Sequence, residues 1–127
     1  MSTLKADTIQ STGGGAATLT KQSAAKTWVT KAADGASIPD SFNVSSLDDD
    51  GTGDFGVNFS SAMNNSSYAI TTGADDAASD TAVTACNSAN GGYATGSAEF
   101  EVVYINATSA RTNYDIYCFI AFHGDLA

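Results

Sequence analysis

The chain has 127 residues, a hydrophobic content of 43% and a formal net charge of −9. This length predicts one domain that buries a modest core, with a short appended segment. The acidity excludes nucleic acid as a partner, because binding to nucleic acid depends mainly on Lys and Arg side chains that neutralise phosphates. Two cysteines and one histidine do not make a zinc site, and we expect no cofactor.

The first 35 residues are the most basic part of the chain. Four lysines and one aspartate precede residue 32, a net charge of +3, whereas Arg111 stands against thirteen acids in the remainder. The three consecutive glycines of "STGGGAA" cannot hold a regular element firmly. We therefore predict an extended N-terminal arm over residues 1–35 that needs a partner surface, and a folded domain over residues 36–127. The stretch "SAAKTWV" is compatible with one helical turn, and we expect Trp28 to anchor the core or its rim.

No run of residues approaches the roughly twenty apolar residues of a membrane span, and the opening "MSTLKADTIQ" lacks the plan of a secretory signal. We therefore expect the chain to be made and folded in a cytoplasm. Such a compartment favours free thiols, although a disulfide between Cys86 and Cys118 stays an open alternative.

From Ser41 the apolar residues recur with a period of two. Phe42 and Val44 alternate with polar residues before the acidic stretch "LDDDGTGD", and Phe55, Val57 and Phe59 do so after it. This alternation predicts two paired strands that cover a core on one side. The intervening acids and glycines are typical of a hairpin connection, because they tolerate or supply the backbone conformations of tight turns.

The same acidic stretch also raises the question of a calcium loop. An EF-hand alignment that starts at Asp48 places Asp50 and Gly53 correctly, but the twelfth position, which needs a bidentate Glu, is Phe59. The flanking segments are strand-like rather than helical. We therefore prefer the hairpin, and keep a different oxygen geometry around Asp48, Asp50 and Asp54 as the weaker alternative.

Further short strands are expected around residues 68–72 and 82–87, separated by the acidic loop Gly73–Asp80 and followed by the turn "SANGG". The segment "SAEFEVVYINATS" alternates again, and the last strand becomes apolar on both faces toward its end, which is typical of a strand in the middle of a sandwich or at a subunit interface. The residues that share its first face are Tyr114, Ile116, Cys118, Ile120 and Phe122. Altogether we predict an all-β antiparallel sandwich of about seven or eight short strands.

Catalytic signals are weak, and we expect no enzyme activity. His123 is the only histidine, it lies at the end of the last predicted strand, and no nucleophile motif accompanies it. Paired carboxylates occur as Asp75 with Asp76 and as Glu99 with Glu101. Such pairs are far more often solvated than catalytic, although a glycosidase-like pair is not excluded by sequence.

Two segments, "MSTLKADTIQSTGGGAATLTKQSAAKTWV" and "IPDSFNVSSLDDDGTGDFGVNFSSAMNNSSYAI", resemble tail-fibre and related virion appendage proteins of marine bacteriophages. The resemblance spans roughly residues 1–70, and it is specific because "DSFNVSS", "GTGDFGVNF" and "SAM" form an ordered string. Two departures are the three acids before "GTGD", where a single acid with Asn is more frequent, and Pro39, where a basic residue is common. The part after residue 70 carries no motif of this family.

The resemblance implies a β-rich, homotrimeric virion module, assembled in the host cytoplasm, that binds other virion proteins and a glycan or protein of the host surface without catalysis. The arm would anchor the module through Leu4, Ile9 and Leu19. The predicted recognition loops would present Asp75, Asp76, Asp80, Asn87 and Asn90. Alternatives are a capsid decoration or cement protein that stabilises the shell and, more remotely, a carbohydrate-active depolymerase.

Overall fold

The computed structural model describes residues 12–13, 24–75, 82–86, 91–105, 108 and 110–127, and of residues 82–86 and 105 the backbone alone. The described part is all-β and antiparallel, which confirms the predicted fold class. Its strands are β1 (Thr27–Lys31), β2 (Asp40–Phe42), β3 (Val44–Gly51), β4 (Asp54–Phe59), β5 (Ala69–Ala74), β6 (Ala82–Cys86), β7 (Ser97–Ile105), β8 (Arg111–Asn113) and β9 (Cys118–His123). These nine exceed the predicted number because β2 and β8 are strands of only three residues. The described residues contain no helix long and apolar enough to cross a membrane.

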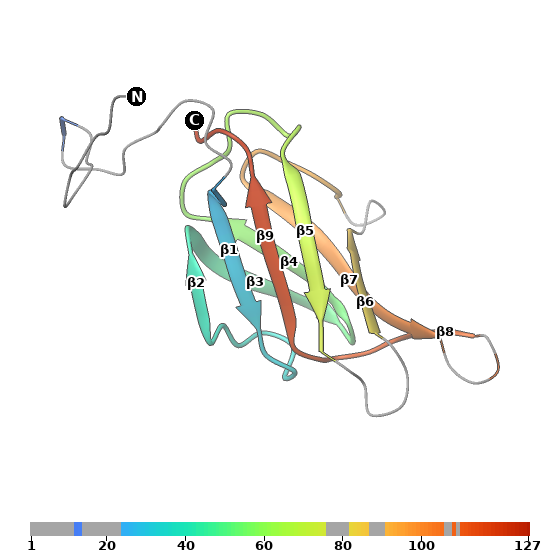
Figure 1. The fold of residues 1–127 in the computed structure, drawn as a ribbon. Coiled ribbons are helices and arrows are strands. Elements are labelled where there is room, and N and C mark those ends of the chain that lie inside the picture. The colour runs from blue at the N-terminus through green and yellow to red at the C-terminus, as the bar shows by residue number, and fades with distance from the viewer. Residues whose placement is uncertain (1–11, 14–23, 76–81, 87–90, 106–107, 109) are drawn as a thin grey trace, which may run out of the picture.

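The strands form two sheets that face each other as layers (Figure 1). The four-stranded sheet has the order β2-β1-β9-β5, and the five-stranded sheet has the order β3-β4-β7-β6, with β8 paired to β7. β1 and β9, distant in sequence, are the central strands of the first sheet, with Trp28 opposite Ala121 and Thr30 opposite Phe119. The four-stranded sheet therefore depends on two pairings between strands far apart in the chain, β1 with β9 and β5 with β9.

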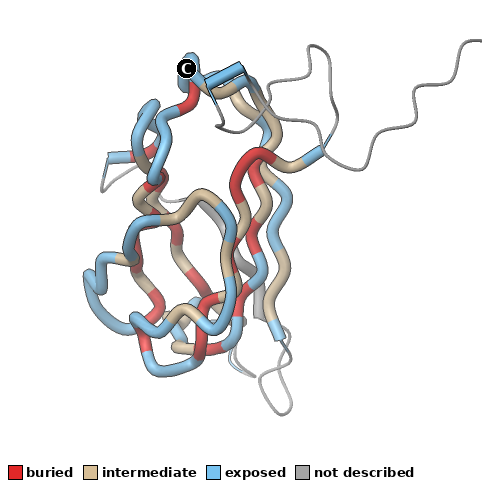
Figure 2. The backbone as a smooth tube through the Cα atoms, turned by 90° about the vertical axis from the view of Figure 1, so that its left-hand side faces the viewer, coloured by how far each residue is buried: buried red, intermediate tan, exposed pale blue. Residues whose placement is uncertain are grey.

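The core lies between the sheets and is built from the inward positions of β1, β4, β7 and β9. Figure 2 shows buried residues that recur along the strands between exposed or half-buried ones. Aromatic rings join the two layers: Phe122 of β9 makes edge-to-face contacts with Phe59 and Phe100 of the facing sheet at centroid distances of 4.9 and 5.8 Å. The buried apolar residues are Val29, Phe55, Val57, Phe59, Met63, Ala98, Phe100, Val102, Ile116, Cys118, Ile120 and Phe122.

β1 lies in the segment that the sequence assigned to the arm. Its alternation is clear, because Thr27, Val29 and Lys31 are buried, whereas the two residues between them face outward. The expected helical turn does not form at Thr27 and Trp28, which are strand residues. The sandwich thus includes residues that precede residue 36, and the predicted anchoring residues of the arm lie outside the described part of the chain.

The chain changes sheets between β2 and β3, at Asn43. Asn43 has a φ of 59°, and it is the one non-glycine residue with positive φ among those described. Its side chain holds this bend, since Nδ2 donates to Thr27 Oγ1 at 2.8 Å and Oδ1 accepts from the Ser61 amide at 2.8 Å. The prediction that Phe42 and Val44 share one apolar face is therefore wrong, because the bend places Phe42 in the other sheet, where its ring is 48% exposed.

The final predicted strand is also divided. Ile116, Cys118, Ile120 and Phe122 are buried in the core as expected, but Tyr114 is exposed and precedes β9. The reason is that the Tyr114 amide donates to the carbonyl of Val102, so that this part of the chain extends β8 along β7 of the five-stranded sheet. Cys118 lies in the core, as expected of a small apolar residue, and the side chain of Cys86 lies outside the described set, so the disulfide stays an open alternative.

Candidate functional site

The acidic stretch forms the predicted hairpin. β3 and β4 pair antiparallel with Gly51 opposite Asp54, and the connection consists of Thr52 and Gly53. Both glycines have positive φ, 133° at Gly51 and 67° at Gly53, and the Asp49 carboxylate accepts a hydrogen bond from the Gly51 amide at 3.1 Å. The glycines thus provide the turn geometry that the sequence predicted.

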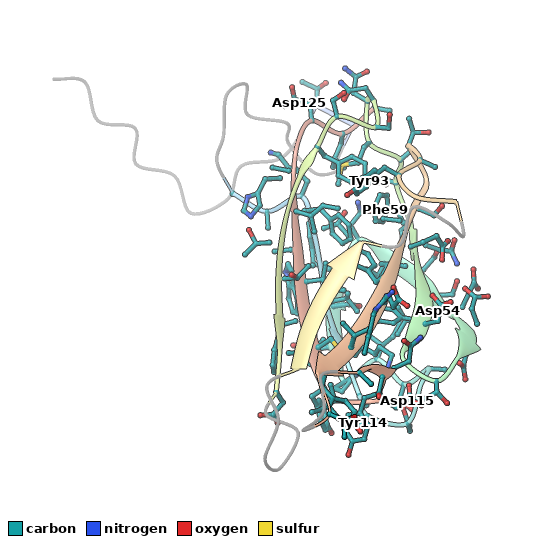
Figure 3. The ribbon with its side chains drawn as sticks, turned by 90° about the vertical axis from the view of Figure 1, so that its right-hand side faces the viewer. Asp54, Phe59, Tyr93, Tyr114, Asp115 and Asp125 are labelled. Atoms are coloured by element: carbon teal, nitrogen blue, oxygen red, sulfur yellow. The ribbon has the colours of Figure 1, made fainter. Side chains whose placement is uncertain are left out.

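Gly53 also lies where three strands meet. Its amide donates to Asp115 Oδ1 at 2.8 Å, and its carbonyl accepts from the Val102 amide at 2.7 Å. A Cβ atom at this position would lie 2.6 Å from both the Tyr114 amide nitrogen and the Val102 carbonyl oxygen. Figure 3 shows Tyr114 and Asp115 together at this end of the sandwich. The hairpin is therefore closed against β7 and the chain that follows β8 without room for a side chain.

The candidate calcium ligands Asp48, Asp50 and Asp54 lie on or beside the outer face of the five-stranded sheet. Asp48 accepts a hydrogen bond from Asn58 Nδ2 at 2.8 Å. Among the described residues no group of three or more His, Cys, Asp or Glu side chains is arranged to hold a metal ion. The oxygens of this stretch therefore take part in turn and cross-strand contacts.

Glu99 of β7 faces the same acids. Burial raises its pKa above the ordinary value of 4.5, and the nearby charges of Asp50, Asp48 and Asp54 raise it further. One of its carboxylate oxygens is buried with no hydrogen-bond partner. We call the outward side chains Asp48, Asp54, Glu99 and Glu101 together with Asp50 the acidic face. Arg111 forms an ion pair with Glu101 at its margin.

The residues considered for catalysis and those predicted for recognition do not form a common site in the described part. His123 lies at the end of β9, on the other sheet from Glu99 and Glu101. Asp75 is exposed just after β5, and its amide donates to the Tyr117 carbonyl at 2.9 Å. The other loop residues, Asp76, Asp80, Asn87 and Asn90, lie outside the described residues.

A different surface gathers aromatic side chains on the outer side of the four-stranded sheet. The register aligns Phe42, Trp28, Ala121 and Thr71 in one row across β2, β1, β9 and β5. The next row includes Thr30 of β1, Phe119 of β9 and Gly73 of β5. Because residues directly opposite each other share a face, all of these side chains point away from the core. We call the set Trp28, Thr30, Phe42, Thr71, Phe119 and Ala121 the aromatic face.

The aromatic face is hollowed at its centre. An open depression of about 400 Å³ lies over β1, β9 and β5 between Trp28 and Phe119, with Thr30, Thr71 and Gly73 in its lining. The Phe119 ring is 51% exposed and lies beside Gly73, where the absence of a side chain leaves room. Its lining is mostly apolar and carries no charged side chain. This combination is typical of a surface that a partner covers.

The sequence did not predict the aromatic face as a site. It placed Trp28 at the core or its rim and Phe42 in the core, and it proposed loops for recognition. One signal was present, because the last strand was predicted to be apolar on both sides and therefore to contact a further layer or subunit. Comparison of the chain with protein-family models, curated proteins and solved structures found no match, so these comparisons assign no function.

Proposed function

We propose that the chain is a structural protein of a phage virion, in the form of a short tail-fibre or fibre-like appendage that acts by binding and not by catalysis. The observation that carries this proposal is the aromatic face. Its Phe42 and Phe119 rings are about half exposed, at 48% and 51%, beside a depression whose lining has no charged side chain, and one acid, Asp40, lies on the edge strand of this surface. Such a surface on a small acidic module supports a role in assembly, where a partner removes the rings from water.

The residues of the ordered string "DSFNVSS…GTGDFGVNF" have structural roles that are consistent with a shared module. Asn43 turns the chain from one sheet to the other, Gly53 closes the hairpin against β7, and Phe55 and Val57 are fully buried. The string therefore encodes how this sandwich is built. The binding partner of the chain and its location on the phage particle are part of the proposal.

The test is to locate the chain on particles. Purified virions of the source phage are expected to contain the chain, and antibody-labelled particles in electron microscopy should carry the label on the tail, in a small multiple of three or six copies. Hundreds of copies on the head would assign the chain to capsid decoration instead. Absence from purified virions would contradict both assignments. Release of fragments from a host polysaccharide by the purified chain would contradict a role without catalysis.

A further inference from the structure

We propose that the aromatic face is a contact surface between copies of this chain, so that the sandwich self-associates through the outer side of its four-stranded sheet. The inference deepens the proposed function, on which it rests for the role of the assembly. The depression between Trp28 and Phe119 would be filled by the same surface of a second copy of the chain. The charge distribution, the lack of polar groups and the shape of the face support it in turn.

The charge distribution favours this face over the others. Each copy has a formal net charge of −9, so two copies repel each other at most orientations. A contact through the five-stranded sheet would bring the acidic face of one copy against that of the next. The outer side of the four-stranded sheet carries one acid, Asp40, which lies on the edge strand β2 opposite Thr30, whereas the acidic face carries five. Approach through this side therefore brings fewer acids of the two copies together than approach through the acidic face.

The polar groups of the aromatic face favour a protein partner over a small polar ligand. Sites for small ligands combine apolar walls with several convergent polar groups that fix the ligand's orientation. Here the side chains of the face offer the indole N–H of Trp28 and the hydroxyls of Thr30 and Thr71, and the remaining members are two phenyl rings and a methyl group. Cores of interfaces between identical chains have this composition, because they are enriched in aromatic residues and poor in charge.

The shape of the face is suited to a contact between identical copies. Phe42 is half exposed on the edge strand β2, whereas the depression lies over β1, β9 and β5 in the same sheet. Each copy thus supplies both a ring and a depression, so a ring of one copy can fill the depression of the next in a closed ring as well as in a pair. This would remove the half-exposed rings of both copies from water.

The test is the mass of the full chain in solution, measured by size-exclusion chromatography with light scattering over a concentration series. The unmodified chain is expected to have a mass of two or more times the 12.9 kDa of a single chain. Phe119→Glu places a carboxylate in the centre of the contact and is expected to weaken association at least about 100-fold, so that single chains predominate. Phe42→Glu tests the same surface at its edge, and serves if the first variant does not fold.

The matched control is Tyr93→Ser. Tyr93 is 50% exposed, close to the 51% of Phe119, but it bridges to Ala98 of the five-stranded sheet and lies near Phe59 at one end of the sandwich (Figure 3). This variant removes an equally exposed ring and is expected to associate like the unmodified chain. Circular dichroism and melting curves of all variants show that the comparison is made between folded chains.

Two results would overturn the proposal. One is a single-chain mass for the unmodified protein up to about 100 µM, which leaves no affinity of biological use. The other is unchanged association of both Phe119→Glu and Phe42→Glu. If the unmodified protein is a single chain and neutral saccharides shift the NMR resonance of the Trp28 indole, the aromatic face binds a sugar and the proposal of self-association is wrong. The presence of the chain on virions is measured separately. A failure of the proposed virion role can therefore be told apart from a failure of the proposed self-association.

Discussion

The outer faces of the two sheets differ in charge although they cover the same core. The four-stranded sheet presents Trp28, Phe42 and Phe119 around an uncharged depression, with Asp40 on its edge strand. The five-stranded sheet presents Asp54 directly opposite Glu101 in its ladder. Like charges directly opposite each other destabilise a sheet, and exposed aromatic rings are costly in water. Neither face is therefore optimised for the stability of an isolated chain.

The inward positions of the strands build the sandwich, whereas the outward positions determine what the sandwich can contact. The inward positions of both sheets are apolar, and their rings meet across the core at Phe122, Phe59 and Phe100. The outward positions of the same strands carry acids on one sheet and aromatic rings on the other. Substitutions at inward positions should consequently change stability, and substitutions at outward positions should change association or pH dependence.

The largest change in stability is expected from a comparison of an inward and an outward ring of the same strand, β9. Phe122→Ala should lower the free energy of unfolding by about 3–5 kcal/mol, because Phe122 is fully buried among rings of both sheets. Phe119→Ala should lower it by less than about 1 kcal/mol under conditions where the chain is a single copy. Urea denaturation measures both values, and equal losses would contradict the separation between inward and outward positions.

The second effect concerns the closure of the five-stranded sheet. Gly53→Ala should destabilise the fold by about 2–4 kcal/mol, because it combines a φ of 67° with a Cβ atom 2.6 Å from two backbone atoms. Gly96→Ala is the matched control, since a Cβ atom there has no neighbour within 4 Å. Thermal melting compares the two. A Gly53→Ala chain as stable as the control would show that β8 and the hairpin do not depend on this close approach.

A third effect concerns the cation between the sheets. Lys31 is 1% exposed, with Nζ 5.0 Å from the centroid of the Phe55 ring, 3.1 Å from the Ala32 carbonyl and 3.9 Å from Asp115 Oδ1. Lys31→Ala removes the packed stem and should cost about 1–3 kcal/mol. Lys31→Met keeps most of the volume and should cost less, since it preserves the packing of the stem and the remaining partner, Asp115, has a 33% exposed side chain that water can solvate. A larger loss with Met than with Ala in urea denaturation would show that the charge outweighs the packing.

The smallest effect is expected on the acidic face. Because the pKa of Glu99 is raised in the folded chain, folding favours its protonated form, and this stabilisation is present below the ordinary value of 4.5 and lost as pH rises through the folded-state pKa. Glu99→Gln should therefore stabilise the chain at pH 7 but not at about pH 3. Solvent screening of this partly exposed group keeps the gain below about 1 kcal/mol.

Melting curves at the two pH values measure the effect of Glu99→Gln. Asp125→Asn is the control, because it removes one negative charge from an exposed position outside the acidic face. A gain of the same size in both variants at pH 7 would assign the effect to net charge rather than to the surroundings of Glu99.

Much of the fold was predictable because local patterns and turn residues agree with it. The hairpin followed from two-residue periodicity on both sides of a glycine-rich turn, and Phe55, Val57 and Phe59 are buried as that pattern requires. Periodicity shows which residues share a side of a strand. It does not show which sheet the strand joins or what covers that sheet.

The sequence-based predictions were wrong where the chain passes from one sheet to the other. Phe42 was assigned to the core because it continues the alternation of Val44, but the positive φ of Asn43 ends that alternation. Tyr114 was assigned to the last strand, but its amide hydrogen bond to Val102 holds it in the other sheet. Both errors have one cause: a bend of one or two residues transfers the chain between layers, and composition changes little across it.

By itself the sequence determined the strand content, the hairpin and the acidity of the chain, because these depend on neighbouring residues and on composition. The tertiary structure decided that β1 lies beside β9, which aligns Trp28 with Ala121 and Thr30 with Phe119. It also decided which side of that sheet is left open. An aromatic face exists because residues from four strands meet in register, and this pairing is set by packing across the whole sandwich rather than by any one segment.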